Sequence, residues 1–484
     1  MADTAAIIIT LPDEVLLHIL ALAAENESWD FFADIWVRPV HLRLAAARPA
    51  LVCRRFYNLA NPILYRNLAV SFHGPSSHAL LMIPQDMMGH LTQDKTLRLY
   101  RTLEQNPSLR RHCRNLSICL ANPIPGLPGH RIRTTEGRDA HVSRSESGHV
   151  LDIFKRLVTW LSGTTTMNIL SLGTTWDSES AAIFSIAAKH MPGLGHVGFY
   201  QPTQPLHIEQ LPQAFAELDV VKEFHTHISG PFARRAPRTR PPSTDRALPL
   251  TSLTLQKYED SPQRLRHSLG FTKALTQFSL VCSPDNGPES EMWSVPQVLS
   301  MLRPHASTLR SLTIGGLRGP SEDPDMSGWN LAAFGALEDL TLHAWDTGYT
   351  DGADAILTVP NLRTFGWTLN KWTLNRTAFV TSGSDVNLDD FGHVHEGWLR
   401  KLRDKAIERG AALRHVSVVL SSVPRHEKWW PWDRLAALKE EFAAKGFVLS
   451  YTPPRSTREQ YEENFRFANS LGGTRRLGPT APVA

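Results

Sequence analysis

Ten short apolar segments recur along the chain at nearly constant spacing, and this regularity limits the folds open to the sequence. Most segments place apolar side chains at positions i, i+3 and i+5, as in Met167, Leu170 and Leu172. The segments begin at Cys113, Met167, Leu194, Val221, Leu250, Leu275, Leu309, Leu337, Leu362 and Leu413. Most steps are 25 to 29 residues, and the two longest, of 54 and 51, are each about two periods. A repeat of this length cannot bury its apolar face alone, so the pattern predicts stacked repeats that share a core.

Helical patterns lie between the apolar segments. Apolar residues follow helical spacing around residues 151–161, 182–187, 398–407 and 435–442. Gly410 and Gly446 come just before the next apolar segments, where a glycine ends a helix. The alternation of short strands and helices predicts an α/β fold, with a parallel sheet covered by helices.

The period and the Leu-x-x-Leu-x-Leu segments resemble leucine-rich repeats. That family places Asn or Cys three residues after the last strand leucine, and only Asn370 matches in this chain. The resemblance therefore implies an irregular leucine-rich-repeat solenoid, with degenerate repeats over residues 109–451. The strand face opposite the helices is the expected binding surface of such a body.

The N-terminal stretch has a different pattern. Leu11 and Pro12 precede a run in which Leu16, Ile19 and Leu20 share one helical face. Pro in a first helical turn loses no hydrogen bond, and Asp13 and Glu14 favour the positive end of the helix dipole. A second apolar stripe follows in residues 51–60, and a third short run, residues 62–68, again begins with Pro.

These three linked segments resemble an F-box, on Leu-Pro-x-Glu at residues 11–14, Val-Cys-Arg-Arg at 52–55 and Pro-x-Leu-Tyr at 62–65. The resemblance implies a three-helix module that docks on a Skp-type adaptor and, through it, on a cullin–RING ubiquitin ligase. It also implies which residues meet the adaptor: Leu11, Pro12, Val15, Leu16, Ile19, Leu20, Val52, Cys53 and Phe56. Residues 24–41 form an aromatic-rich insertion between the first two helices. The alternative is a plain helical bundle whose stripes serve only as core.

The expected domain order follows from these patterns. Residues 11–68 form the F-box-like module, residues 69–108 a linker, residues 109–451 the repeat body and residues 452–484 a disordered tail. The combination resembles the F-box proteins with degenerate leucine-rich repeats that are common in fungi.

Composition narrows the partners and the compartment. The net charge of +4 over 484 residues argues against a nucleic-acid binder, whose signature is a concentrated basic patch. No window approaches the length of a membrane span, and residues 5–11 make a poor secretory signal. The four cysteines are scattered, which favours a reducing cytoplasmic or nuclear setting.

Three polar clusters are considered as candidate sites. Arg234, Arg235, Arg238 and Arg240 lie in a proline-rich stretch, residues 231–249, that could bind an acidic or phosphorylated partner, serve as a nuclear import signal, or be a solvated insertion. His225 and His227, and the run from Asp389 to Glu396, superficially resemble metal ligands. Neither has a supporting ligand set, so we expect no metal. The sequence also shows no catalytic motif, so we expect no enzyme activity and no cofactor.

The sequence thus predicts a substrate-recognition subunit of an SCF-type (Skp–cullin–F-box) ubiquitin ligase. Residues 11–68 would bind the adaptor, and the repeat body would bind an unidentified target protein. The alternative is a stand-alone leucine-rich-repeat scaffold that is not assembled into a ligase, with the helical module as its N-terminal cap.

Overall fold

The computed structural model describes a large part of the chain in separate segments. They are residues 11–18, 54–71, 93–120, 153–171, 178–201, 220–228, 248–258, 262–282, 293–317, 326, 328–347, 352–369, 391, 393–420, 431–454 and 457–460. The chain divides into two compact units, Met1–Ala274 and Leu275–Ala484, which are described separately.

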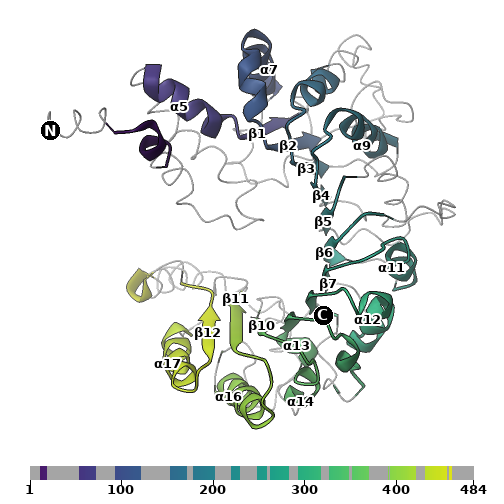
Figure 1. The fold of residues 1–484 in the computed structure, drawn as a ribbon, viewed down its shortest axis with the longest axis vertical. Coiled ribbons are helices and arrows are strands. Elements are labelled where there is room, and N and C mark those ends of the chain that lie inside the picture. Colours follow the sequence, from purple (N-terminus) through teal and green to yellow (C-terminus); the bar gives the residue numbers. More distant parts are fainter. Residues whose placement is uncertain are drawn as a thin grey trace, which may run out of the picture. The chain divides into compact units, whose positions relative to one another are not determined.

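Unit 1 is a parallel sheet whose described strands follow each other in sequence order (Figure 1). The strands are β1 (Asn67–Ser71), β2 (Asn115–Leu120), β3 (Thr166–Ser171), β4 (His196–Gln201), β5 (Glu223–Ile228) and β6 (Ser252–Tyr258). The helical elements are α5 (Arg54–Leu64), α7 (Gln93–Gln105), the 3₁₀ helix η2 (Pro107–His112), α9 (Ser178–His190) and α11 (Pro262–Leu269). Residues 13–18 and 153–160 are also helical.

Unit 2 repeats this plan. Its strands are β7 (Gln277–Cys282), β8 (Ser311–Gly315), β9 (Asp339–His343), β10 (Thr364–Leu369), β11 (His415–Leu420) and β12 (Val448–Tyr451), and each pairs in parallel with the next. The helical elements are α12 (Val295–Leu302), η4 (Arg303–His305), η5 (Leu331–Ala333), α13 (Ala344–Thr347), α14 (Ala353–Ile356), α16 (His393–Glu408) and α17 (Trp432–Ala443). Sequential parallel strands connected through helical segments define a leucine-rich-repeat-like fold, as the period predicts.

The core consists of straight rows of apolar side chains, because equivalent positions of neighbouring strands lie in register. In unit 2 one row runs Phe278, Leu312, Leu340, Phe365, Val416 and Leu449, and all six are buried. In the neighbouring core row, which contains Leu342 and Val418, Trp367 of β10 stacks on Trp398 of α16 with ring centroids 4.7 Å apart. Trp367 also donates from Nε1 to Thr347 Oγ1 at 3.0 Å, so its polar atom is satisfied inside the core.

A backbone ladder joins the repeats just before the strands begin. The carbonyl oxygen of Arg66 accepts from the N–H groups of Arg114 and Asn115, at 2.8 and 3.0 Å. The carbonyl of Arg114 accepts in the same way from Thr165 and Thr166. The double acceptance recurs in unit 2, where the acceptors are Thr276, Arg310, Glu338 and Arg363. Repeats without the consensus Asn are thus still tied together, by main-chain atoms.

Two expectations from the sequence need correction. The sheet begins at β1, whose Leu68 and Val70 pair with Leu116 and Ile118, so the sheet extends into the stretch assigned to a linker. In β3 the predicted triad Met167, Leu170 and Leu172 is wrong, because it starts three residues too late. Met167 and Ile169 enter the two core rows, while Leu170 pairs with Cys119 and Tyr200 on the opposite face.

The triad that the structure shows for β3 is Thr164, Met167 and Ile169, so its first position is a threonine. Thr164 is fully buried, and its hydroxyl lies 3.6 Å from the sulfur of Cys113, the equivalent residue of the preceding repeat. Thr164 does not match the apolar pattern because it is polar. Its contact with Cys113 nevertheless lets it occupy a buried position that is apolar in the other repeats. The predicted helix stops are confirmed. Gly410 has φ +60° after α16, and Gly446 has φ +76° after α17.

Candidate protein-binding surfaces

The N-terminal module is built from two segments that lie far apart in the sequence. Leu16, on helical residues 13–18, packs with Phe56 and Leu59 of α5. Leu11, Leu17 and Ile63 surround this cluster as partly buried neighbours. We call residues 11–18 together with α5 the N-terminal module.

Arg55 ties the two segments together. Its Nε donates to Asp13 Oδ1 at 2.7 Å, and its Nη2 donates to the carbonyl oxygen of Leu11 at 2.5 Å. Arg55 thus fixes the chain at the start of the first helix, beside the Leu-Pro pair. Both partners of the ion pair are a third or more exposed, so its contribution is to geometry more than to stability.

The residues predicted to meet an adaptor fall into three groups. Pro12 and Val15 are exposed, with Val15 at 42%, and Leu11 is half-buried. Leu16 and Phe56 are buried in the module's own core. Ile19, Leu20, Val52 and Cys53 lie outside the described residues, as does the insertion at 24–41. Tyr57, exposed at 47% on α5, was not singled out by the sequence motif.

The strand face away from the core carries small polar side chains in unit 2. Its middle row, in register across the strands, is Ser279, Thr313, Thr341, Gly366, Ser417 and Ser450. Two glycines leave room for polar neighbours on this face. A Cβ at Gly366 would fall 2.4 Å from Thr341 Oγ1, and one at Gly315 would fall 2.1 Å from the His343 ring.

The same face of unit 1 carries amide and imidazole groups. Asn115 donates from Nδ2 to Asn67 Oδ1 at 2.7 Å, across β1 and β2. His196 Nδ1 lies 3.1 Å from Glu223 Oε2, across β4 and β5. Hydroxyl, amide and imidazole groups on a sheet face can donate to and accept from a polar partner, which suits protein recognition.

Of the two clusters that superficially resemble metal ligands, the first lies on β5. His225 is buried and tilted against Tyr200, with ring centroids 5.9 Å apart. Within the described segments, no group of three or more His, Cys, Asp or Glu side chains could hold a metal ion.

The second cluster is divided between a core and a surface. His395 is buried between aromatic neighbours, with ring centroids 5.5 Å from Trp367 and 5.6 Å from Phe391. Burial lowers the pKa of His395 to about 4, against a smaller opposing effect of Glu396. Asp389 and Asp390 lie outside the described residues, as do Arg234, Arg235, Arg238 and Arg240.

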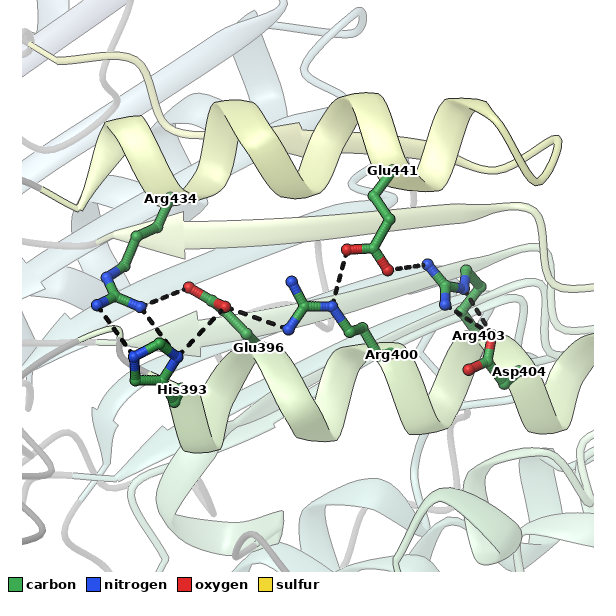
Figure 2. A network of polar contacts seen from close by, with 7 residues as sticks. All are labelled: His393, Glu396, Arg400, Arg403, Asp404, Arg434 and Glu441. Carbon is green, nitrogen blue, oxygen red and sulfur yellow. Dashed lines mark hydrogen bonds and ion pairs between the residues drawn. The ribbon is translucent and has the colours of Figure 1, made fainter.

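Glu396 belongs instead to an ionic network between α16 and α17 (Figure 2). It accepts from Arg434 Nη1 of α17 at 2.8 Å and from Arg400 Nη1 at 3.2 Å. Arg400 and Arg403 then donate to the two oxygens of Glu441 on α17, at 2.8 and 2.7 Å. Burial alone would raise the pKa of Glu396, but Arg434 and Arg400 hold it below the usual range.

The network balances its charges. Arg403 also pairs with Asp404. The network therefore contains three arginines and three carboxylates, namely Arg400, Arg403 and Arg434 with Glu396, Asp404 and Glu441. This arrangement fixes α17 against α16, and the arginines also hold the pKa of Glu441 below its usual range, against the opposing effect of burial. Trp432 of α17 contributes to the same end of the unit by donating from Nε1 to the carbonyl oxygen of Thr452 at 2.9 Å.

In the part of the chain that the structure describes, no helix is both long and apolar enough to cross a membrane.

Comparisons with known proteins find matches among solved structures. No protein-family model matches the chain, and neither does any curated protein. Among solved structures, the leucine-rich-repeat-containing protein LegL7 from Legionella pneumophila is similar with a TM-score of 0.39 and 12% identity, over 79% of this chain and 99% of that one. A sugar phosphate isomerase/epimerase from Parabacteroides distasonis has a TM-score of 0.15 and 9% identity, over 85% and 94%. At these TM-scores neither likeness carries an argument, and the repeat fold rests on strand order and register.

Proposed function

We propose that this chain is the substrate-recognition subunit of an SCF-type ubiquitin ligase. The N-terminal module binds a Skp-type adaptor, and the strand face of the repeats binds the target protein. The chain supplies no chemical step. It acts by proximity, because holding the target beside the ligase's conjugating enzyme raises the effective concentration of the target's lysines.

One observation carries the proposal. The Leu-Pro segment folds onto α5 through Leu16 and Phe56, while Pro12 and Val15 remain exposed. An exposed proline and valine at the start of a short helix offer an apolar contact that the module does not use itself. The module also leads directly into the sheet, since α5 ends at Leu64 and β1 starts at Asn67.

The test is capture of a Skp-type adaptor by the full chain carrying Val15→Glu. A charge at this exposed position should weaken capture at least about tenfold, because an ionised carboxylate would be desolvated in the contact. The matched control is Val394→Glu, since Val394 is also helical and also 42% exposed, but lies on α16. We expect the control to bind normally. Undiminished capture by Val15→Glu, or no capture by the unaltered chain, would refute adaptor binding through this surface.

The second candidate function is a stand-alone protein-binding scaffold. It is favoured by the burial of Leu16 and Phe56, which leaves two of the motif residues with a purely internal role. In that case the module is an N-terminal cap on the repeats. The capture experiment separates the two, because the scaffold binds a target without the adaptor.

A further inference from the structure

Unit 1 carries a concentrated positive charge on its helical side. Residues 96–120 and 153–171 contain six arginines and one lysine but a single acidic residue, Glu104, a net charge of +6. The whole chain carries only +4. The small total therefore hides a local basic surface, and the rest of the chain is net negative.

An aromatic stack organises this surface. Tyr100 of α7 stacks on Trp160 with ring centroids 4.9 Å apart, and the Arg110 guanidinium lies 3.9 Å from the centroid of the Trp160 ring. Arg156 donates from Nη1 to the hydroxyl of Tyr100 at 3.0 Å. α7, η2 and helical residues 153–160 are thus joined side by side. We call Tyr100, Arg110, Arg111, Arg114, Arg156 and Trp160 the basic–aromatic patch.

Two of its arginines are held in place by main-chain oxygens. Arg110 donates from Nε to the carbonyl of Leu103 at 2.8 Å, and Arg114 donates from Nη1 to the carbonyl of Gly163 at 2.9 Å. Arg114 is nevertheless exposed. Arg110 also donates from Nη2 to the carbonyl of Glu104 at 3.4 Å. A guanidinium carries five N–H donors, so these anchoring bonds leave others for a ligand. An arginine that is already ordered loses less side-chain entropy when it binds.

The charges of two arginines of the patch also act on the pKa of a neighbouring histidine. Burial, Arg111 and Arg114 together lower the pKa of His112 below its ordinary value. Two of these three causes are arginine charges, which disfavour a further positive charge on the imidazole.

We propose that the basic–aromatic patch is a second interaction surface, which binds a carboxylate-rich segment of a partner protein. Paired guanidinium donors match carboxylate oxygens. The aromatic rings are not an open platform for nucleic-acid bases, because Trp160 is half-buried, stacked on Tyr100 and covered by Arg110. This proposal concerns a different surface from the adaptor contact and does not depend on it.

The experiment measures binding of the full chain to a fluorescent peptide of alternating glutamate and serine. The variant carries Arg111→Glu, Arg114→Glu and Arg156→Glu, three exposed arginines of the basic–aromatic patch. We expect binding by the unaltered chain that weakens with added salt, and a loss of at least about tenfold in the variant. Arg114→Gln, which removes one anchored guanidinium, should weaken binding by a smaller factor.

The matched control reverses three exposed charges of unit 2, with Arg363→Glu, Lys439→Glu and Lys445→Glu. It changes net charge equally and should bind the peptide within about twofold of the unaltered chain. An equal loss in the control would overturn the proposal, because binding would then depend only on total charge. Tighter patch-dependent binding of single-stranded RNA of the same net charge would reassign the surface to nucleic acid. Absence of peptide binding would also overturn the proposal. Val15→Glu should leave peptide binding unchanged, so failure here and failure of adaptor capture are distinguishable.

Discussion

The imidazole of His343 lies over Gly315, with the ring carbon Cδ2 2.1 Å from where a Cβ on Gly315 would be. His343 is the last residue of β9, Gly315 is the last of β8, and the two strands are paired neighbours. The missing side chain thus makes space for a ring that is only 3% exposed. Burial lowers the pKa of His343 to about 4, so the ring is neutral in this position at physiological pH.

Replacing Gly315 by Ala should therefore displace the His343 ring. We expect unfolding free energy to fall by about 1–3 kcal/mol, the usual cost of overpacking a filled site. Gly335→Ala is the control, because a Cβ there meets no atom within 4 Å, and it should change stability by less than about 0.5 kcal/mol. Denaturant unfolding of both variants makes the comparison, and equal stabilities would show that the ring moves aside at no cost.

The ionic network should stabilise the packing of α17 on α16. Glu396→Gln removes the charge that Arg434 and Arg400 share, and should cost about 1–3 kcal/mol because Glu396 is largely buried. The comparison is Asp433→Asn on α17, whose pair with Arg458 is exposed on both sides. That change should cost less than about 1 kcal/mol. Thermal unfolding of the two variants tests the difference, and a larger loss in Asp433→Asn would contradict it.

Stability should decline in mild acid because of His395. Its pKa is about 4 in the folded chain, below the ordinary 6.5, so between these values the unfolded chain binds a proton that the folded chain excludes. The stability that depends on neutral His395 is fully present above pH 6.5 and is lost as pH falls toward 4. His395→Phe keeps an aromatic ring and should reduce the loss of stability between pH 7 and pH 5. His267→Phe, at an exposed histidine, should leave that loss unchanged.

The N-terminal module should depend on Phe56. Phe56→Ala empties the cluster around Leu16 and should destabilise the module by about 3–5 kcal/mol. Val15→Ala, at an exposed neighbour of Leu16, should have an effect below about 0.5 kcal/mol. Amide hydrogen exchange in residues 13–18 and α5 reports this directly, since faster exchange there indicates local opening. Unchanged protection in Phe56→Ala would show that the two segments are not held by this cluster.

Much of the fold follows from the spacing of apolar residues. The triads beginning at Leu309, Leu337 and Leu362 give the core rows of β8, β9 and β10 without adjustment, because each contains only apolar residues at the required steps. The pattern failed at β3, where buried Thr164 holds an apolar position through its contact with Cys113. Residue type alone does not reveal a polar group that is satisfied inside a core.

The candidate surfaces were harder to predict from the sequence than the fold. A motif indicates that Leu16 and Val15 matter, but burial separates the core residue from the exposed one. The basic–aromatic patch was missed because it combines three elements, with Tyr100 on α7, Arg110 on η2, and Arg156 and Trp160 on helical residues 153–160. The small net charge of the whole chain gives no sign of this local positive charge. The ionic network joins Glu396 to Arg434, 38 residues apart, and no periodicity links them.

The ladder of carbonyl groups before each strand has an evolutionary consequence. Since every acceptor and donor in it belongs to the main chain, almost any residue can occupy those positions, as Arg66, Thr165, Gly195 and Glu338 illustrate. The residue types at these positions can then change while the backbone hydrogen bonds between repeats remain. Ancestry in such a protein is preserved in the intervals between repeats long after it has faded from their residues.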